Sequence, residues 1–138
     1  LTNEINKNIS ENKIKNYNRS SIQGRLHQKK DIISWDMVKK MYLNPKYISP
    51  CHAGSLFGII DAKGNIEPCE ILKGRTLGNL RDVDMNFMKL WENKKNKENK
   101  NYIKKSKCHC TYECALSYNI LGNWRYQIPL GLSALDFS

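Results

Sequence analysis

Apolar residues recur at helical spacing in the segment DIISWDMVKKMY, which covers residues 31–42. A period of about 3.6 residues places several of them on one face, and this spacing predicts a helix. The residues on that face are Ile32, Trp35, Val38 or Lys39, and Tyr42. Asp31 or Ser34 supplies an N-cap, and the Asn44-Pro45 pair ends the helix because proline does not continue it.

A different pattern, between Ser55 and Cys69, predicts a β-hairpin. The short apolar run SLFGIID ends at Asp61, and the segment Ala62–Asn65 follows it as a turn before IEPC. Gly64 takes the turn position that requires a positive φ. The two ends of this segment should therefore lie close together.

A third pattern predicts a helix that opens at Asp84. Phe87, Leu90 and Trp91 share one face, which we expect to pack on the hairpin, while the lysine-rich continuation extends into water. The segment TLGNL at 76–80 is interpreted as a chain break before this helix. The helix brings the chain to Cys108.

The two ends of the chain carry weaker patterns. The segment Leu1–Asn18 is polar and has no sustained period, so it is interpreted as a lead-in without an assigned function. Beyond Cys114, a short apolar segment, a Gly122-Asn123 turn and a break at Pro129 follow. This tail is expected to cover one side of the cysteine site.

Charge narrows the possible partners. The formal net charge is +10, and the segment Lys94–Lys107 holds seven Lys against one Glu. Only Tyr102 interleaves with these cations, so a solvated helix face is favoured, an acidic peptide or protein stays open, and nucleic acid is not expected. The start of the chain lacks a signal-peptide pattern and no apolar run reaches membrane length, which predicts a cytoplasmic protein with no membrane partner.

Five cysteines carry the candidate chemistry. Cys51 and Cys69 flank the predicted hairpin, and Cys108, Cys110 and Cys114 crowd into CHCTYEC. An odd, clustered set does not suit a disulfide framework, whereas thiolates are soft ligands for zinc or iron. Four of the five are expected to bind a metal or iron–sulfur centre, because such sites take four ligands, and spacing does not identify the spare thiol.

Other residues give no independent catalytic site. His52 and His109 adjoin cysteines and His27 stands alone, and all three are expected to form hydrogen bonds or face solvent. Asp61 and Glu67 are explained by turn chemistry and strand alternation. Cys110 and Cys114 begin a CxxxCxxC pattern, but position 117 is Ser, so the catalytic triad of radical S-adenosylmethionine enzymes is missing. The fragment is not expected to catalyse a reaction by itself.

The string CHAGSLFGIIDAKGNIEPCEIL, followed by TLGNLRD, a helix bearing LW, and CHCTYEC, resembles the C-terminal SPASM/twitch region of radical S-adenosylmethionine enzymes. The resemblance covers Cys51 to Cys114. In that family the region binds an auxiliary four-iron four-sulfur cluster, and the corresponding positions here are Cys51, Gly64, Cys69, the segment Leu77–Leu80, Trp91, Cys108, Cys110 and Cys114. The chain has fewer cysteines than a full SPASM domain, which points to the single-cluster, twitch-like form.

The resemblance implies an α+β fold, a small β-hairpin followed by a helix and a Cys-rich loop, stabilised by the metal or cluster. Residues 1–48 would be a linker and helix at the end of an upstream catalytic partial barrel, which would hold S-adenosylmethionine and a second 4Fe-4S cluster. Residues 49–138 would form the auxiliary-cluster domain, supporting substrate binding or electron transfer in the modification of a peptide, protein or small metabolite. The alternative is a zinc-stabilised binding module for nucleic acid or an acidic protein.

Overall fold

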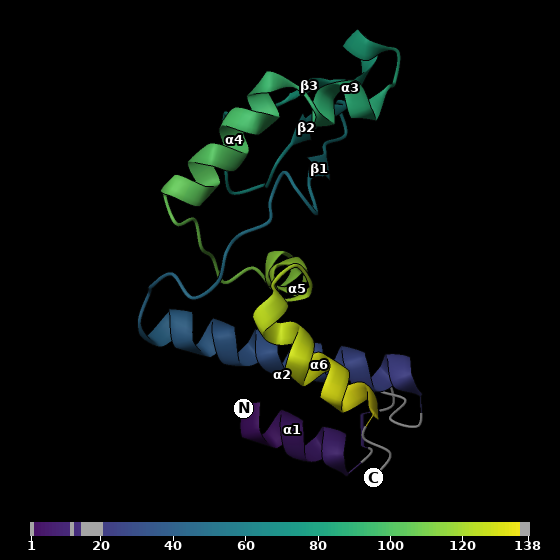
Figure 1. The fold of residues 1–138 in the computed structure, drawn as a ribbon, viewed down its shortest axis with the longest axis vertical. Coiled ribbons are helices and arrows are strands. Elements are labelled where there is room, and N and C mark those ends of the chain that lie inside the picture. Colours follow the sequence, from purple (N-terminus) through teal and green to yellow (C-terminus); the bar gives the residue numbers. More distant parts are fainter. Residues whose placement is uncertain (1, 12, 15–20, 136–138) are drawn as a thin grey trace. The chain divides into compact units, whose positions relative to one another are not determined.

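The computed structural model describes residues 2–11, 13–14 and 21–135. Within these residues the fold is mostly helical, with one small three-stranded antiparallel sheet in the order β1-β2-β3 (Figure 1). This mixture agrees with the α+β class predicted from the sequence. Stabilisation by a metal or cluster stays a proposal.

The chain divides into two compact units. Unit 1 contains residues 1–49 and 110–138, and unit 2 contains residues 50–109. Each unit has its own buried residues, so we describe them separately. The sequence-based boundary between residues 48 and 49 concerns an upstream barrel and stays a prediction.

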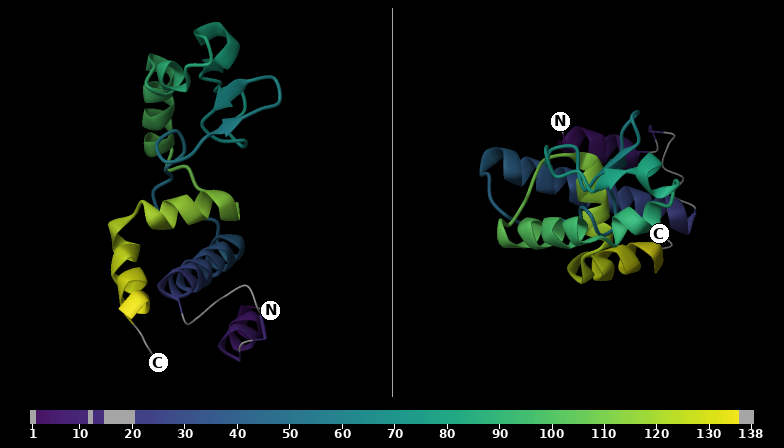
Figure 2. Two further views of the ribbon diagram at one scale, coloured as in Figure 1. Left: turned by 90° about the vertical axis from the view of Figure 1, so that its right-hand side faces the viewer. Right: turned by 90° about the horizontal axis from the view of Figure 1, so that it is seen from above.

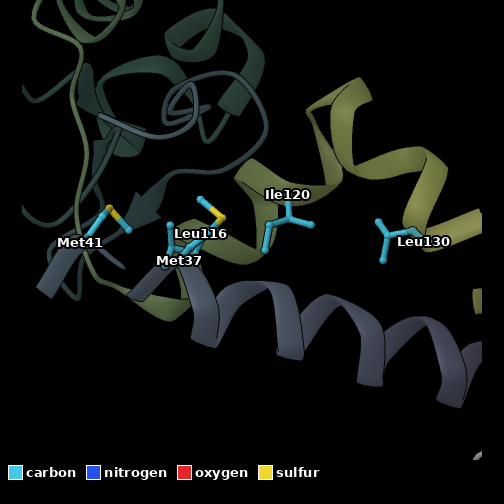
Figure 3. Close-up of a cluster of buried hydrophobic side chains, with 5 residues drawn as sticks. All are labelled: Met37, Met41, Leu116, Ile120 and Leu130. Carbon is cyan, nitrogen blue, oxygen red and sulfur yellow. The ribbon is translucent and has the colours of Figure 1, made fainter. Parts of the chain in front are cut away.

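Unit 1 is helical. Its elements are α1 (Thr2–Ser10), α2 (Ile22–Leu43), α5 (Glu113–Leu121) and α6 (Trp124–Leu135). One buried apolar cluster joins α2, α5 and α6, and Figure 3 shows its side chains meeting between these helices. Its members are Met37, Met41, Leu116, Ile120 and Leu130.

Helix α2 is longer than the sequence pattern predicts. It begins at Ile22, and the side chain of Ser21 caps it by accepting a hydrogen bond from the backbone N–H of Gly24 at 3.0 Å. The predicted caps, Asp31 and Ser34, therefore lie inside the helix, and Ser34 is fully buried. The predicted end is confirmed, because Asn44 is the C-cap.

The tail forms two helices, where the sequence pattern predicted a short segment broken at Pro129. Gly122 is the C-cap of α5, so the turn predicted there is present. Pro129 lies inside α6 and does not end it. It occupies the sixth helical position, so only the backbone bond to the first turn is lost, and the buried neighbour Leu130 anchors the helix in the unit 1 core.

Unit 2 contains the predicted hairpin. Strands β1 (Ile59–Ile60) and β2 (Asn65–Glu67) pair antiparallel, and Gly64 turns between them with φ of 86°. A third strand, β3 (Gly78–Asn79), pairs with β2 (Figure 2). The prediction of a simple chain break at residues 76–80 is therefore wrong, because part of that segment adds a strand.

The single helix predicted from Asp84 onward is two helices, and a 3-10 turn precedes them. The three elements are the 3-10 turn η1 (Leu80–Val83), α3 (Phe87–Trp91) and α4 (Lys94–Lys105). Asp84 is in the left-handed region, so it ends η1 instead of opening a helix. The predicted packing face is confirmed: Leu90 is buried with Ile66 of β2, and Phe87 and Trp91 pack against them.

The break between α3 and α4 is made by Asn93. Its side-chain oxygen accepts a hydrogen bond from the backbone N–H of Asn96 at 2.8 Å, which is an N-cap for α4. Its side-chain nitrogen donates to the carbonyl of Leu77 at 2.9 Å. The start of α4 is thus tied to the segment that leads into β3.

Among the helices of the described residues, none combines the length and apolar character needed to cross a membrane.

Candidate metal centre

Three of the five predicted ligands come together in unit 2. Cys69 is buried with Ala53 and Ile103, and Cys51 and Cys108 pack against the same group. We call these three cysteines the thiol cluster. Their side chains come from three separate segments: the loop before the hairpin, the chain after β2, and the chain after α4.

The hairpin brings Cys51 and Cys69 together. In β1 and β2, Ile59 pairs with Glu67, so the strands return the chain to its starting end within a few residues. Pro68, which is buried, then leads directly to Cys69. Cys51 packs against the buried group that contains Cys69, so the two side chains lie in the same cluster.

The end of α4 positions Cys108. Ser106 caps the helix, and Lys107 has a left-handed φ of 51°. The N–H of Cys108 then donates to the carbonyl of Ile103 at 3.1 Å, and the N–H of Lys107 donates to the carbonyl of Lys104 at 3.3 Å. This pair of bonds is a Schellman motif, and it turns Cys108 back beside buried Ile103.

The surroundings of Cys69 suit a thiolate bound to a cation. Burial raises the pKa of the Cys69 thiol, and the nearby backbone N–H groups of Ile71 and Leu72 offset part of this rise. Backbone N–H groups directed at a sulfur are a feature of iron–sulfur sites, where they tune the reduction potential. Without a cation, burial keeps the proton on Cys69.

The loop after Cys51 is held by a buried asparagine of α4. The side-chain nitrogen of Asn96, which is fully buried, donates to the carbonyl of Gly54 at 2.9 Å and to that of Trp91 at 2.6 Å. Gly54 has φ of 73°, and a Cβ there would lie 2.6 Å from the Asn96 side-chain oxygen. Helix α4 thereby fixes the conformation of the Cys51 loop as well as the place of Cys108.

Sequence reasoning missed Asn96 because polar residues of a lysine-rich helix were assigned to its solvated face. A signal was nevertheless present. Asn93, Asn96 and Asn99 recur every third residue and continue to Ile103, and the last three are the buried residues of α4. Amides repeated at helical spacing among lysines indicate a face that contacts backbone.

The remaining cysteines are described with unit 1. Cys110 is half-buried in the irregular segment after Cys108, and Cys114 is exposed in the first turn of α5. The sequence pattern predicted irregular backbone for all three late cysteines, and this is wrong for Cys114, which is helical.

The histidines and hairpin carboxylates have ordinary structural surroundings. His109 is exposed, with Nδ1 2.9 Å from the carbonyl oxygen of Lys107, and His27 is exposed on α2. Burial lowers the pKa of His52. Asp61 accepts hydrogen bonds within the hairpin turn, and Glu67 accepts one from the Thr76 hydroxyl at 3.3 Å, so turn and strand contacts account for both carboxylates.

The donor set fits a thiolate-bound centre chemically, although the side chains are not arranged as a finished site. In the part of the chain that the structure describes, no group of three or more His, Cys, Asp or Glu is placed so that it could hold a metal ion as it stands. None of the five cysteines, each of them within that part, forms a disulfide bond. Three cysteines in one apolar cluster supply the soft sulfur donors that zinc or an iron–sulfur cluster prefers.

Comparison with known proteins does not assign the chain to a family. No protein-family model matches it, and no curated protein and no solved structure is significantly similar to it. The resemblance to SPASM/twitch regions therefore rests on the cysteines, glycines and spacing of this sequence, and what it implies is a proposal.

Proposed function

We propose that the chain is the C-terminal auxiliary-cluster domain of a radical S-adenosylmethionine enzyme and that it holds one four-iron four-sulfur cluster. The observation that supports this is that Cys51, Cys69 and Cys108, from three segments, belong to or pack against one buried cluster of unit 2. The fold needed for this is the hairpin with Gly64 at its turn and α4 ending at the Schellman motif.

The residues around the thiol cluster have separable roles. Cys51, Cys69 and Cys108 would hold iron through their thiolates, and the nearby N–H groups of Ile71 and Leu72 would favour the charged form of the Cys69 sulfur. Ala53 and Ile103 exclude water from one side. When bound, the cluster would supply a substrate-binding or electron-accepting centre for the modification of a peptide, protein or small metabolite by the full enzyme.

The fourth ligand is Cys110 or Cys114. Cys110 lies two residues beyond Cys108, so the chain alone keeps its Cα within about 7 Å of that of Cys108. Cys114 is exposed in α5. Substitution of each cysteine separately identifies the spare thiol.

The test is anaerobic purification and reconstitution of the full chain, followed by iron and sulfide analysis. We expect a brown protein with absorbance near about 400 nm and about four iron and four sulfide per chain. Cys51→Ala, Cys69→Ala and Cys108→Ala should each lose most of the iron, and only one of Cys110→Ala and Cys114→Ala should do so.

A colourless protein that binds one zinc per chain under these anaerobic conditions would overturn the proposal and favour the zinc-stabilised module. Zinc found only after aerobic preparation would not, since thiolate sites accept zinc when iron is lost. Iron retained by every single variant would also contradict it, because the thiol cluster would not be the ligand set.

A further inference from the structure

A polar pocket of about 430 Å³ lies in unit 2 between the loop after Cys69 and the first turns of α4. None of its lining residues is a cysteine of the thiol cluster, and three of them are cations. The lining residues are Lys73, Gly74, Arg75, Thr76, Lys95, Glu98 and Asn99.

Arg75, one of the lining residues, is held in place by Asn99 and Tyr102. Its Nη1 donates to the side-chain oxygen of Asn99 at 3.2 Å, and the Asn99 side-chain nitrogen donates back to the Arg75 carbonyl at 2.8 Å. Asn99 is 5% exposed, so this reciprocal pair is anchored in the unit. The guanidinium carbon also lies 3.4 Å from the centroid of the Tyr102 ring. A guanidinium fixed in this way loses little side-chain entropy when it binds an anion.

The pocket is lined by more cationic side chains than carboxylates. Within the described residues, no carboxylate forms an ion pair with Lys73, Arg75 or Lys95. The single carboxylate of the lining, Glu98, lies 3.9 Å from Lys94. Three cations therefore face one carboxylate, and an anion is the ligand that this arrangement attracts.

The pocket fits carboxylates better than a nucleic acid strand. Single-stranded nucleic acid is bound by aromatic rings on which bases stack, along an extended basic groove. Tyr102 is the ring beside this pocket, and Arg75 already covers one of its faces. A fixed Arg flanked by two Lys in a small pocket matches one or two carboxylate side chains, because the guanidinium fork pairs with a carboxylate through two hydrogen bonds.

We propose that the pocket of Lys73, Arg75 and Lys95 binds an acidic peptide segment of the substrate, through its Asp or Glu carboxylates. This inference rests on the proposed function, because only that function makes the bound peptide a substrate. It adds that the substrate is a peptide. Arg75 is the anchor that orients a carboxylate, Lys73 and Lys95 supply attraction from either side, and Glu98 limits the charge that the pocket accepts.

The test is fluorescence anisotropy of a labelled hexaglutamate peptide with the full chain at about 0.15 M salt. Lys95→Glu should weaken binding about ten-fold, because one attractive charge becomes repulsive. Lys104→Glu is the matched control, since it makes the same charge change about 13 Å further along α4 and on the opposite face, beyond the screening length of about 8 Å. It should change the affinity by less than about two-fold. Glu98→Gln should tighten binding about two-fold by removing the one carboxylate.

Equal losses in Lys95→Glu and Lys104→Glu would overturn the proposal, because binding would then follow net charge alone. A six-nucleotide single-stranded DNA that binds as tightly as the peptide, or no measurable peptide binding, would do the same. The iron content of each variant is measured in parallel. Peptide binding without iron would contradict the cluster proposal alone, and iron without peptide binding would contradict the pocket alone.

Discussion

Gly78 is a residue at which the backbone and the core both exclude a side chain. Its φ is 149°, and a Cβ there would lie 2.7 Å from a methyl carbon of Leu90, which is buried with Ile66, Leu77 and Leu80. We predict that Gly78→Ala lowers the free energy of unfolding by about 3 kcal/mol, from backbone strain and overpacking together. Urea denaturation of the full chain measures this.

Gly74 is the control for that substitution. Its φ is 75°, but no atom lies within 4 Å of an added Cβ, so Gly74→Ala carries the backbone strain without the clash. It should cost about 1 kcal/mol. Equal effects of the two substitutions would show that the packing of β3 on Leu90 is looser than described.

Asp61 makes the hairpin turn sensitive to pH. Hydrogen bonds from Asn65, from its side chain first and then its backbone N–H, hold the pKa of this carboxyl below its usual value, with a further bond from the backbone N–H of Lys63. A lowered pKa in the folded state means that the stabilisation is present above the unfolded pKa of about 3.9 and disappears as pH falls through the folded value.

We therefore predict that Asp61→Asn has a lower free energy of unfolding than the parent at about pH 6. This difference should shrink toward about pH 3. Urea denaturation across this range measures it. Asp82→Asn, the same charge change at an exposed position of η1, should change the stability at about pH 6 by less than Asp61→Asn does. A constant gap for Asp61→Asn would contradict the assignment of the stabilisation to the carboxylate.

At the scale of elements, the end of α4 carries strain next to a proposed ligand. Lys107 adopts the left-handed conformation that a Schellman motif needs, and glycine is the residue that adopts it without cost. We predict that Lys107→Gly raises the free energy of unfolding by about 1 kcal/mol. Lys104→Gly, inside the last turn of the same helix, should lower it by about as much. Destabilisation by both would mean that the Lys107 side chain stabilises the helix end in another way.

Sequence patterns correctly predicted the elements that depend on residues close together in the chain. The hairpin follows from its apolar runs and Gly64, and the packing of Leu90 on Ile66 follows from helical spacing. Strand β3 is two residues long and depends on pairing with β2, so the sequence contains no periodic pattern that predicts it. The break between α3 and α4 depends on Asn93, whose bond to the Leu77 carbonyl joins residues far apart in the sequence.

In the candidate site, too, contacts that follow from a local element were predicted, and contacts between distant segments were not. The closeness of Cys51 and Cys69 follows from the hairpin between them, and the sequence predicted it. The hydrogen bond from the Asn96 side chain to the Gly54 carbonyl joins residues 42 positions apart. No pattern in either segment predicts that the two residues come into contact. The sequence pattern also missed the first turns of α2, which follow Ser21 in a polar stretch. They are held by a contact with a distant part of the chain, because the Arg25 side chain donates a hydrogen bond to the carbonyl of Ala134 in α6 at 2.8 Å.

At the scale of the whole molecule, the two units differ in what stabilises them. Unit 1 has a core of long aliphatic side chains and methionines from α2, α5 and α6, with no cysteine in that cluster. In unit 2, thiols make up much of one of the two buried clusters, and the sheet has strands of only two or three residues. Short strands and small cores need additional cross-links, which thiolate–metal bonds supply.

Cluster binding should therefore stabilise the units unequally. A ligand that binds only the folded state adds stability where its ligands are fixed, so amide hydrogen exchange in the segment Pro50–His109 should slow when the cluster is bound. Exchange within α2 should change little, because its buried residues Met37 and Met41 belong to the core of unit 1, which holds no cysteine. The measurement compares the anaerobically reconstituted chain with the chain after removal of iron by a chelator. If exchange slows equally in both units, or not at all around Cys69, the cysteines of unit 2 do not anchor the cluster.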